Sequence, residues 1–163
     1  MASTHDYIAD KRNKDILIYI NGEFFHRSDA KVSVFDSGFL LGDGVWEGIR
    51  LHKSSLIHFD QHINRLYAGA DAIAMKIQLN KNELKDAVRL TLEKNAMHSD
   101  THIRLIVSRG IKSTPYQHPK VTIGDPTIVI IPEYKKPNSE VFDIGIRLAS
   151  VKTKRDNMVQ DPK

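Results

Sequence analysis

The sequence contains no cysteine. This absence excludes disulfide bonds, metal sites built on thiolates and a cysteine nucleophile. Eight histidines are present, and His58 and His62 have the i, i+4 spacing of a helical metal pair. We expect Asp60 to cap a helix between them, which leaves His58 outside that helix, and the glutamate of the metalloprotease motif is missing. The sequence therefore predicts no metal site.

Long apolar runs are also missing. No stretch reaches the roughly 20 apolar residues of a membrane-spanning helix, and the N-terminus lacks the apolar core of a signal peptide. The net charge is only +4, because 24 basic residues are scattered among 20 acidic ones. A nucleic-acid-binding surface needs a clustered basic face with interleaved aromatic residues, which the sequence does not show. We expect a cytoplasmic protein with neither nucleic acid nor a membrane as partner.

Short apolar runs separated by turn signals are present along most of the chain. Six strands are predicted, at residues 16–20, 23–27, 45–51, 56–59, 102–108 and 127–131. Asn21-Gly22 is a typical two-residue hairpin turn between the first two. The last strand is apolar throughout, so we expect it at the centre of a sheet. The connection at 109–126 is long, and long loops inside compact domains tend to be functional.

Two amphipathic helices are predicted among these strands. The first begins at Asp60, and its apolar stripe consists of Ile63, Leu66, Tyr67, Ala70, Ile73 and Ala74. The second starts at Asn80, which forms a capping-box pattern with Glu83, and it ends near Asn95. Its inward face is predicted to be Leu84, Ala87, Val88, Thr91 and Leu92. This pattern indicates an α+β fold, a small antiparallel sheet with two helices.

The composition divides the chain into four parts. Residues 1–14 are polar and mixed in charge, and we expect a mobile arm. Residues 15–131 form the small N-terminal domain, and residues 132–138 indicate an interdomain linker. A further strand is predicted at 141–153, but one strand cannot form a layer of its own. We therefore expect residues 139–163 to be the truncated beginning of a second, larger domain.

Gly38, Gly42, Gly44 and Gly48 lie within eleven positions. They allow the backbone to approach a ligand or to adopt a positive φ. A dinucleotide-binding fingerprint opens a helix after a strand, whereas these glycines precede a strand. A phosphate-binding P-loop is excluded because no Gly-Lys-Ser/Thr follows. By spacing alone, a tight structural turn is favoured over a ligand-binding loop.

Residues 34–50 read Val-Phe-Asp-Ser-Gly-Phe-Leu-Leu-Gly-Asp-Gly-Val-Trp-Glu-Gly-Ile-Arg, and His62-Ile-Asn-Arg65-Leu66 follows downstream. Together these motifs resemble the class IV (fold type IV) pyridoxal-phosphate aminotransferases. That family includes the branched-chain and D-amino acid aminotransferases and aminodeoxychorismate lyase. The resemblance extends from about Ile18 to the end of the chain. It implies a homodimer that binds pyridoxal 5'-phosphate between a small and a large domain. The resemblance also implies that residues 139–163 begin this large, cofactor-binding domain, which would be of α/β type.

The resemblance assigns cofactor and substrate contacts to four residues. Arg65 matches the family's phosphate-binding arginine, and the planar fork of a guanidinium suits bidentate phosphate contact. Trp46 matches an aromatic residue that lines the substrate pocket. Arg104 matches an arginine that branched-chain members direct towards the substrate, which favours an L-amino acid pocket. Arg109 and the loop through His118 resemble the segment that closes over the pocket, often that of the neighbouring subunit.

The resemblance also requires a lysine that binds the cofactor covalently and moves a proton during the reaction. Many members carry it in a segment of the form Asp-Pro-x-x-Lys, and this chain ends with Asp161-Pro162-Lys163. We expect Lys163 in this role, with a lysine two residues further on as the alternative. Lys152 and Lys154 are more distant competitors. The acid that protonates the pyridine nitrogen and the second phosphate-binding loop are expected beyond the chain.

The reaction that the resemblance implies is a transamination. An amino group moves from an amino acid, branched-chain and L by preference, to a 2-oxo acid such as 2-oxoglutarate. One alternative keeps the cofactor but catalyses β-elimination from aminodeoxychorismate. Another is a non-catalytic binding domain that has kept the fold. The 163-residue portion by itself is expected to be inactive, because half of the cofactor's ligands would lie elsewhere.

Overall fold

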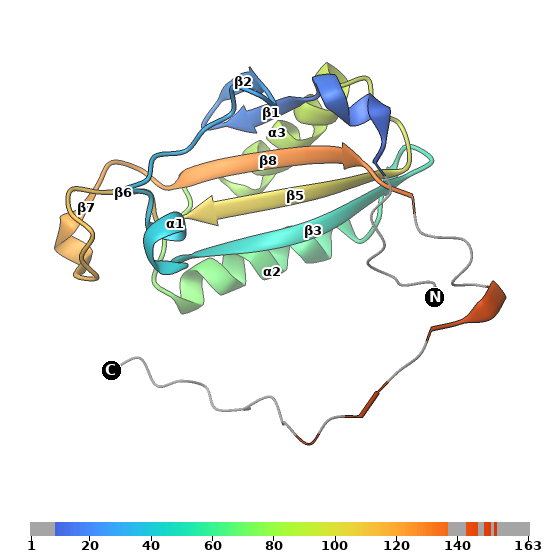
Figure 1. Cartoon of the computed structure of the whole chain (residues 1–163). Coiled ribbons are helices and arrows are strands. Elements are labelled where there is room, and N and C mark those ends of the chain that lie inside the picture. Colours follow the sequence, from blue (N-terminus) through green and yellow to red (C-terminus); the bar gives the residue numbers. More distant parts are fainter. Residues whose placement is uncertain (1–8, 137–142, 147–148, 151, 153–163) are drawn as a thin grey trace. The chain divides into compact units, whose positions relative to one another are not determined.

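The structure is a computed structural model that describes residues 9–136, 143–146, 149–150 and 152 (Figure 1). The chain divides into two units, one of residues 9–136 and one that comprises both ends. All of the helices and strands named below belong to the first unit. That unit is an α+β domain, as the sequence predicts.

A six-stranded antiparallel sheet is the centre of the domain, with the strand order β2-β1-β8-β5-β3-β4. Its strands are β1 (Leu17–Ile20), β2 (Glu23–His26), β3 (Gly44–His52), β4 (Ser55–Leu56), β5 (Thr101–Ser108) and β8 (Thr127–Tyr134). A separate two-stranded ribbon, β6 (Ile111–Lys112) with β7 (Thr122–Ile123), lies in the long connection after β5. Strand β8 is central, as its apolar sequence predicts.

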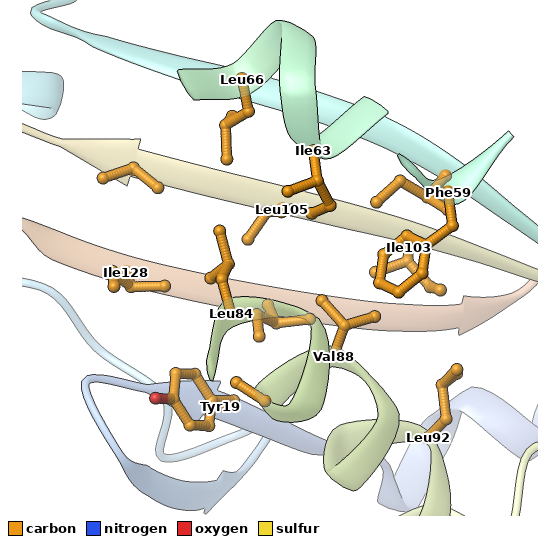
Figure 2. Packing of buried hydrophobic residues seen from close by; sticks show 14 of the residues in the cluster. Tyr19, Phe59, Ile63, Leu66, Leu84, Val88, Leu92, Ile103, Leu105 and Ile128 are labelled. Carbon is orange, nitrogen blue, oxygen red and sulfur yellow. The ribbon is translucent and has the colours of Figure 1, made fainter. Parts of the chain in front are cut away.

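Two helices, α2 (Phe59–Ala72) and α3 (Lys81–Lys94), lie on the same face of the sheet (Figure 1). Strand β5 alternates accordingly: Ile103, Leu105 and Val107 are buried towards the helices, and His102 and Arg104 are turned to the other face. Figure 2 shows the resulting core between the strands and the two helices. Each fully buried leucine or isoleucine stabilises the fold by about 1.5–3 kcal/mol. The face opposite α2 and α3 carries no such helix layer within residues 9–136.

The ends of both helices follow from local sequence. Asn80 caps α3 through the predicted capping box with Glu83. At its C-terminus, the N–H of Met97 bonds to the carbonyl of Leu92 and that of Ala96 to Glu93, which is a Schellman motif. Helix α2 ends in the same way. Its Ala74, like Ala96, has a positive φ, a conformation that glycine usually supplies at this position.

The start of α2 differs from the prediction. The helix begins at Phe59, its N-cap is His58 with φ +50°, and Asp60 lies in the first turn instead of capping it. The predicted return strand at 56–59 is shortened to Ser55–Leu56. The burial of Phe59 in the core explains both differences, because its side chain packs as part of the helix. Asp60 is used in an ion pair with Lys85.

Strand β8 continues to Tyr134, so the predicted linker at 132–138 begins three residues too early. Proline is tolerated at position 132 because β1 pairs with β8 only through Val129 and Ile130, and one side of the strand is free there. The predicted mobile arm at 1–14 is also partly wrong. Its described part contains a 3-10 helix, η1 (Lys11–Asp15), which is bonded to the end of β8. Residues 1–8 lie outside the described residues.

The strand predicted at 141–153 is not found where the structure describes that segment. Asp143 and Ile144 are helical, and Gly145 has φ +70°, which breaks an extended run. A strand needs a partner for its backbone groups. No strand occurs after Tyr134 among the described residues. The proposed second domain therefore stays a prediction.

The long connection at 109–126, by contrast, is partly ordered by β6, β7 and a 3-10 helix, η2 (Pro119–Val121).

Candidate active site

The open face of the sheet contains a hollow of about 600 Å³. Its floor is aliphatic, and its end is closed by the glycine-rich segment around helix α1 (Ser37–Leu41). The floor residues come from three strands and are Ile18, Ile20, Ile106, Val129 and Ile131. A hollow of this size with apolar walls is suited to a small organic ligand.

The glycines of this segment serve close packing. Gly42 ends α1 with φ +68°, and a Cβ on Gly44 would lie 2.6 Å from the carbonyl oxygen of Val107. Asp36 caps α1 and accepts a hydrogen bond from the hydroxyl of Ser108, at 2.8 Å. The glycines therefore bring α1 against β5. The sequence leaves open whether this segment is a tight structural turn or a ligand-binding loop, and the structural turn accounts for these contacts.

Two of the predicted substrate-binding residues lie together on the open face. The guanidinium of Arg104 lies over the indole of Trp46, with its central carbon 4.0 Å from the ring centroid. Trp46 is 61% exposed and lines the hollow. Gly48 is the cross-strand partner of Arg104, so no β3 side chain stands opposite it. The stack holds a positive charge flat at the edge of an apolar hollow, an arrangement suited to a carboxylate with an aliphatic side chain.

Arg65 lies on α2 and forms a bidentate ion pair with Glu47 of β3. Its Nε donates to Oε1 at 2.7 Å, and its Nη2 donates to Oε2 at 2.6 Å. His62 Nδ1 also bonds to Oε2, at 2.8 Å. The Glu47 side chain is 3% exposed, whereas that of Arg65 is 72% exposed. The guanidinium is thus fixed on one side and open to solvent on the other.

The electrostatics of this cluster keep both partners charged. Burial by itself would raise the pKa of Glu47, but hydrogen bonds and charge from Arg65 and His62 outweigh it and lower that pKa below its usual value. In return, the hydrogen bond and charge of Glu47 raise the pKa of Arg65. The site therefore offers an anion a permanently charged guanidinium.

Arg109 has a different environment. Its Nε and Nη2 donate to the carboxylate of Asp43, at 2.7 and 3.1 Å. Nη2 and Nη1 also donate to the carbonyls of Ile73 and Ala74 at the end of α2, at 2.7 and 3.0 Å. Four of its five N–H bonds are used within the domain. These contacts tie the start of β3 to α2, and the predicted substrate contact of Arg109 stays a prediction.

Comparison with known proteins identifies the family. The sequence profile described as "Amino-transferase class IV" matches residues 44–162, most of the chain. The chain belongs to the class IV aminotransferases.

Individual class IV aminotransferases agree with this. The chain is 41% identical over 138 residues to a putative branched-chain-amino-acid aminotransferase of Methanocaldococcus jannaschii, covering 85% of this chain and 46% of that protein. It is 37% identical over 147 residues to branched-chain-amino-acid aminotransferase-like protein 1 of Arabidopsis thaliana, covering 89% and 26%. The chain therefore spans between a quarter and a half of these relatives.

A solved structure shows the same fold. The branched-chain amino acid aminotransferase from Escherichia coli superimposes with a TM-score of 0.64. The match covers 74% of this chain and 41% of that one, at 26% identity. The antiparallel sheet with its helices is thus the small N-terminal domain of this aminotransferase fold.

Sequence reasoning missed the role of two residues in this aminotransferase domain. Glu47 is not among the candidate residues of the sequence analysis, although an acid at an inward-facing strand position near a His-x-x-Arg helix is a signal for an ion pair. His102 shares a face of β5 with Arg104, and its ring lies over Gly48, where an added Cβ would be 3.0 Å from the imidazole. Burial lowers the pKa of His102, and the charges of Arg104, Lys135 and Arg50 lower it further.

The predicted catalytic role of Lys163 stays a prediction. Lys163 and its competitor Lys154 lie outside the described residues, and Lys152 is exposed. Among the described residues no group of three or more metal-ligating side chains occurs. No helix in the same part of the chain is long and apolar enough to cross a membrane.

Proposed function

We propose that the chain is the N-terminal portion of a pyridoxal-phosphate-dependent aminotransferase. It would transfer an amino group from an amino acid, a branched-chain L-amino acid by preference, to a 2-oxo acid such as 2-oxoglutarate. The observation that carries the proposal is the exposed guanidinium of Arg65, which is anchored on buried Glu47 and which, by sequence resemblance, matches the family's phosphate-binding arginine. A charged fork with one open side fits a phosphate group.

Residues on the two faces of β3 would bind different groups. On the helix side, Arg65 would bind the cofactor's phosphate. On the open face, Arg104 would bind the substrate carboxylate, with Trp46 keeping its guanidinium in place. The aliphatic floor of the hollow would exclude water and accept an aliphatic side chain. When bound, the cofactor supplies an electron sink for the substrate's Cα. The amine of Lys163 would hold the cofactor and take the proton from that Cα.

The names of the relatives support the branched-chain preference, and the aliphatic floor agrees with it. The homodimeric state, the cytoplasmic location, the larger second domain and a substrate contact of Arg109 belong to the same proposal. The homodimeric state and the contact of Arg109 follow from the family resemblance, the second domain from the resemblance together with the predicted linker, and the cytoplasmic location from the lack of long apolar runs in the sequence. The inactivity of residues 1–163 by themselves is likewise proposed, because the relatives are much longer.

The test uses the complete polypeptide that carries this chain. Purified with pyridoxal 5'-phosphate, it should absorb visible light, and borohydride reduction followed by peptide mapping should label Lys163. Transfer from L-leucine, L-isoleucine and L-valine to 2-oxoglutarate should exceed transfer from D-alanine. Release of pyruvate from aminodeoxychorismate without an amino acceptor would instead identify the β-elimination reaction. A colourless protein that retains no cofactor would indicate a binding domain.

The same polypeptide tests Arg65 directly. Replacing Arg65 by alanine removes charge-assisted hydrogen bonds that contribute about 1.5–3 kcal/mol each. Cofactor affinity should fall by about tenfold or more, since 1.4 kcal/mol corresponds to a factor of ten. Unchanged cofactor retention and turnover in Arg65→Ala would contradict the proposed site.

A further inference from the structure

We propose that Glu47 is a positioning residue for the anion-binding site: it holds Arg65 in one orientation so that the outer edge of the guanidinium meets a phosphate. The inference rests on the proposed function, because it assumes that Arg65 contacts the cofactor's phosphate. It adds a role for a buried carboxylate that would itself touch neither cofactor nor substrate.

The geometry of the pair limits how Arg65 can bind a ligand. Both carboxylate oxygens of Glu47 are occupied by α2, Oε1 by Arg65 Nε and Oε2 by Arg65 Nη2 together with His62 Nδ1. A carboxylate accepts, so Nδ1 of His62 carries a hydrogen. Within the described residues Nη1 of Arg65 makes no hydrogen bond. The Nη1 amine and the second hydrogen of Nη2 are therefore the groups left for an anion.

The energetics do not favour a purely structural pair. Hydrogen bonds and charge from Arg65 and His62 offset the cost of removing the Glu47 carboxylate from water, as its lowered pKa indicates, but a pair whose cation is largely exposed adds little stability beyond that offset. Helix α2 already has buried contacts to the sheet through Phe59, Ile63, Leu66 and Ala70. An arginine side chain, however, has many rotamers, and fixing one of them beforehand removes an entropic cost from ligand binding. The pair makes physical sense as preorganisation of the guanidinium.

The sign of the electrostatics makes this inference testable. Glu47 is negative and close to the expected phosphate, so by charge alone its removal should strengthen phosphate binding. Loss of positioning should weaken phosphate binding. The variant Glu47→Gln keeps the shape of the side chain and removes its charge, and the two effects therefore oppose each other in one measurement. A net weakening identifies positioning as the larger effect.

The experiment compares pyridoxal 5'-phosphate with pyridoxal, which lacks the phosphate, in the complete polypeptide. The phosphate preference is the dissociation constant of pyridoxal divided by that of pyridoxal 5'-phosphate, so a larger ratio means a larger contribution of the phosphate to binding. We expect Glu47→Gln to reduce this ratio several-fold, because leaving one long side chain unfixed costs up to about tenfold in affinity and the loss of the negative charge offsets part of that cost. A general loss of folding would weaken the binding of both compounds alike and leave the ratio unchanged. Asp60→Asn is the matched control. It removes a carboxylate of the same helix, α2, from its ion pair with Lys85 of α3, and it does not touch Arg65.

Two arginine variants separate the possible results. Arg65→Ala should abolish the phosphate preference; if it does not, the proposed phosphate site itself is wrong. Arg65→Lys keeps a charge on an exposed position and should fold normally. An ammonium lacks the planar fork through which Nε and Nη2 of Arg65 bind Glu47, so the ratio should fall as in Glu47→Gln. If Arg65→Ala lowers the ratio while Glu47→Gln or Arg65→Lys leaves it unchanged or raises it, the positioning role is overturned and the phosphate site stands.

Discussion

At the scale of single residues, the two helix ends show how backbone geometry and sequence can disagree. Ala74 and Ala96 close Schellman motifs with φ of 50° and 49°. A side chain with a Cβ is strained in this left-handed conformation. The buried methionines that follow, Met75 and Met97, anchor the motifs in the core and hold the alanines in place.

Replacing Ala96 by glycine should therefore stabilise the domain. The expected gain is about 0.5–1 kcal/mol, because relief of the strain exceeds the extra freedom of glycine in the unfolded chain. Urea unfolding measures it. The control Ala68→Gly lies in the exposed interior of α2 and should lose about 1 kcal/mol. Destabilisation by both substitutions would show that the left-handed conformation of Ala96 carries no strain.

Lys112 is a second residue whose chemistry and surroundings disagree. It is 2% exposed, and the one hydrogen bond of its Nζ within residues 9–136 is a long one, 3.4 Å, to the hydroxyl of Thr122. Lys112→Met keeps the length of the side chain and removes a poorly satisfied buried amine, so stability should rise by about 1–3 kcal/mol. Chemical denaturation tests this, with exposed Lys120→Met expected to stay within about 0.5 kcal/mol. A loss of stability in Lys112→Met would mean that the amine is well satisfied.

At the scale of elements, the segment 10–13 binds the end of β8 through hydrogen bonds and a cation–π contact. Asn13 bonds to both backbone groups of Tyr134, accepting from its N–H at 2.7 Å and donating to its carbonyl at 2.9 Å. Arg12 lies over the Tyr134 ring and forms a bidentate pair with Asp10. The side chain of Asn13 thus replaces a neighbouring strand at the point where the chain leaves the sheet.

This segment gives a prediction about pH. Hydrogen bonds from Arg12, first from its side chain and then from its backbone N–H, lower the pKa of Asp10 from 3.8 to about 2. Because the folded pKa is below the unfolded one, the contribution of Asp10 to stability is present above pH 3.8 and is lost as the pH falls towards 2. NMR titration of the carboxyl should find the lowered midpoint. Arg12→Ala removes the side-chain bonds but keeps the backbone N–H at position 12, so the midpoint should rise only part of the way towards the ordinary value. An unchanged midpoint in that variant would contradict the assignment.

The elements also show what the sequence can predict. The α3 helix follows entirely from local signals, since the capping box, the inward face and the end near Asn95 all occur as expected. The start of α2 differs from the prediction, which had Asp60 as the cap, because the burial of Phe59, a tertiary contact, outweighs the capping preference of Asp60. The contacts of Arg65 with Glu47 and of Arg104 with Trp46 join residues that are far apart in the sequence or on different strands. Residue patterns suggest such pairs only after the strand register is known.

At the scale of the whole molecule, the domain keeps helices on one face of its sheet and an aliphatic hollow on the other. Trp46 is the sole tryptophan of the sequence and lies at this hollow, so its fluorescence reports on that face alone. In the isolated chain of residues 1–163, iodide should quench this fluorescence strongly. In the complete polypeptide, the signal of Trp46 is the part of the fluorescence that Trp46→Phe removes. A branched-chain 2-oxo acid should reduce the quenching of that part, whereas Arg104→Met should abolish the reduction. Quenching that is weak from the start would show that Trp46 is covered.

Strand β3 places Trp46 and Glu47 next to each other in the chain and on opposite sides of the sheet. A strand reverses the direction of every side chain when it is shifted by one residue. Insertion of a single amino acid before Trp46 would therefore aim the indole into the core and the carboxylate into the hollow, disabling both halves of the site together. We therefore expect variation in this stretch to be confined to exchanging one side chain for another, and differences in length between related proteins to fall in the turn at Lys53 instead.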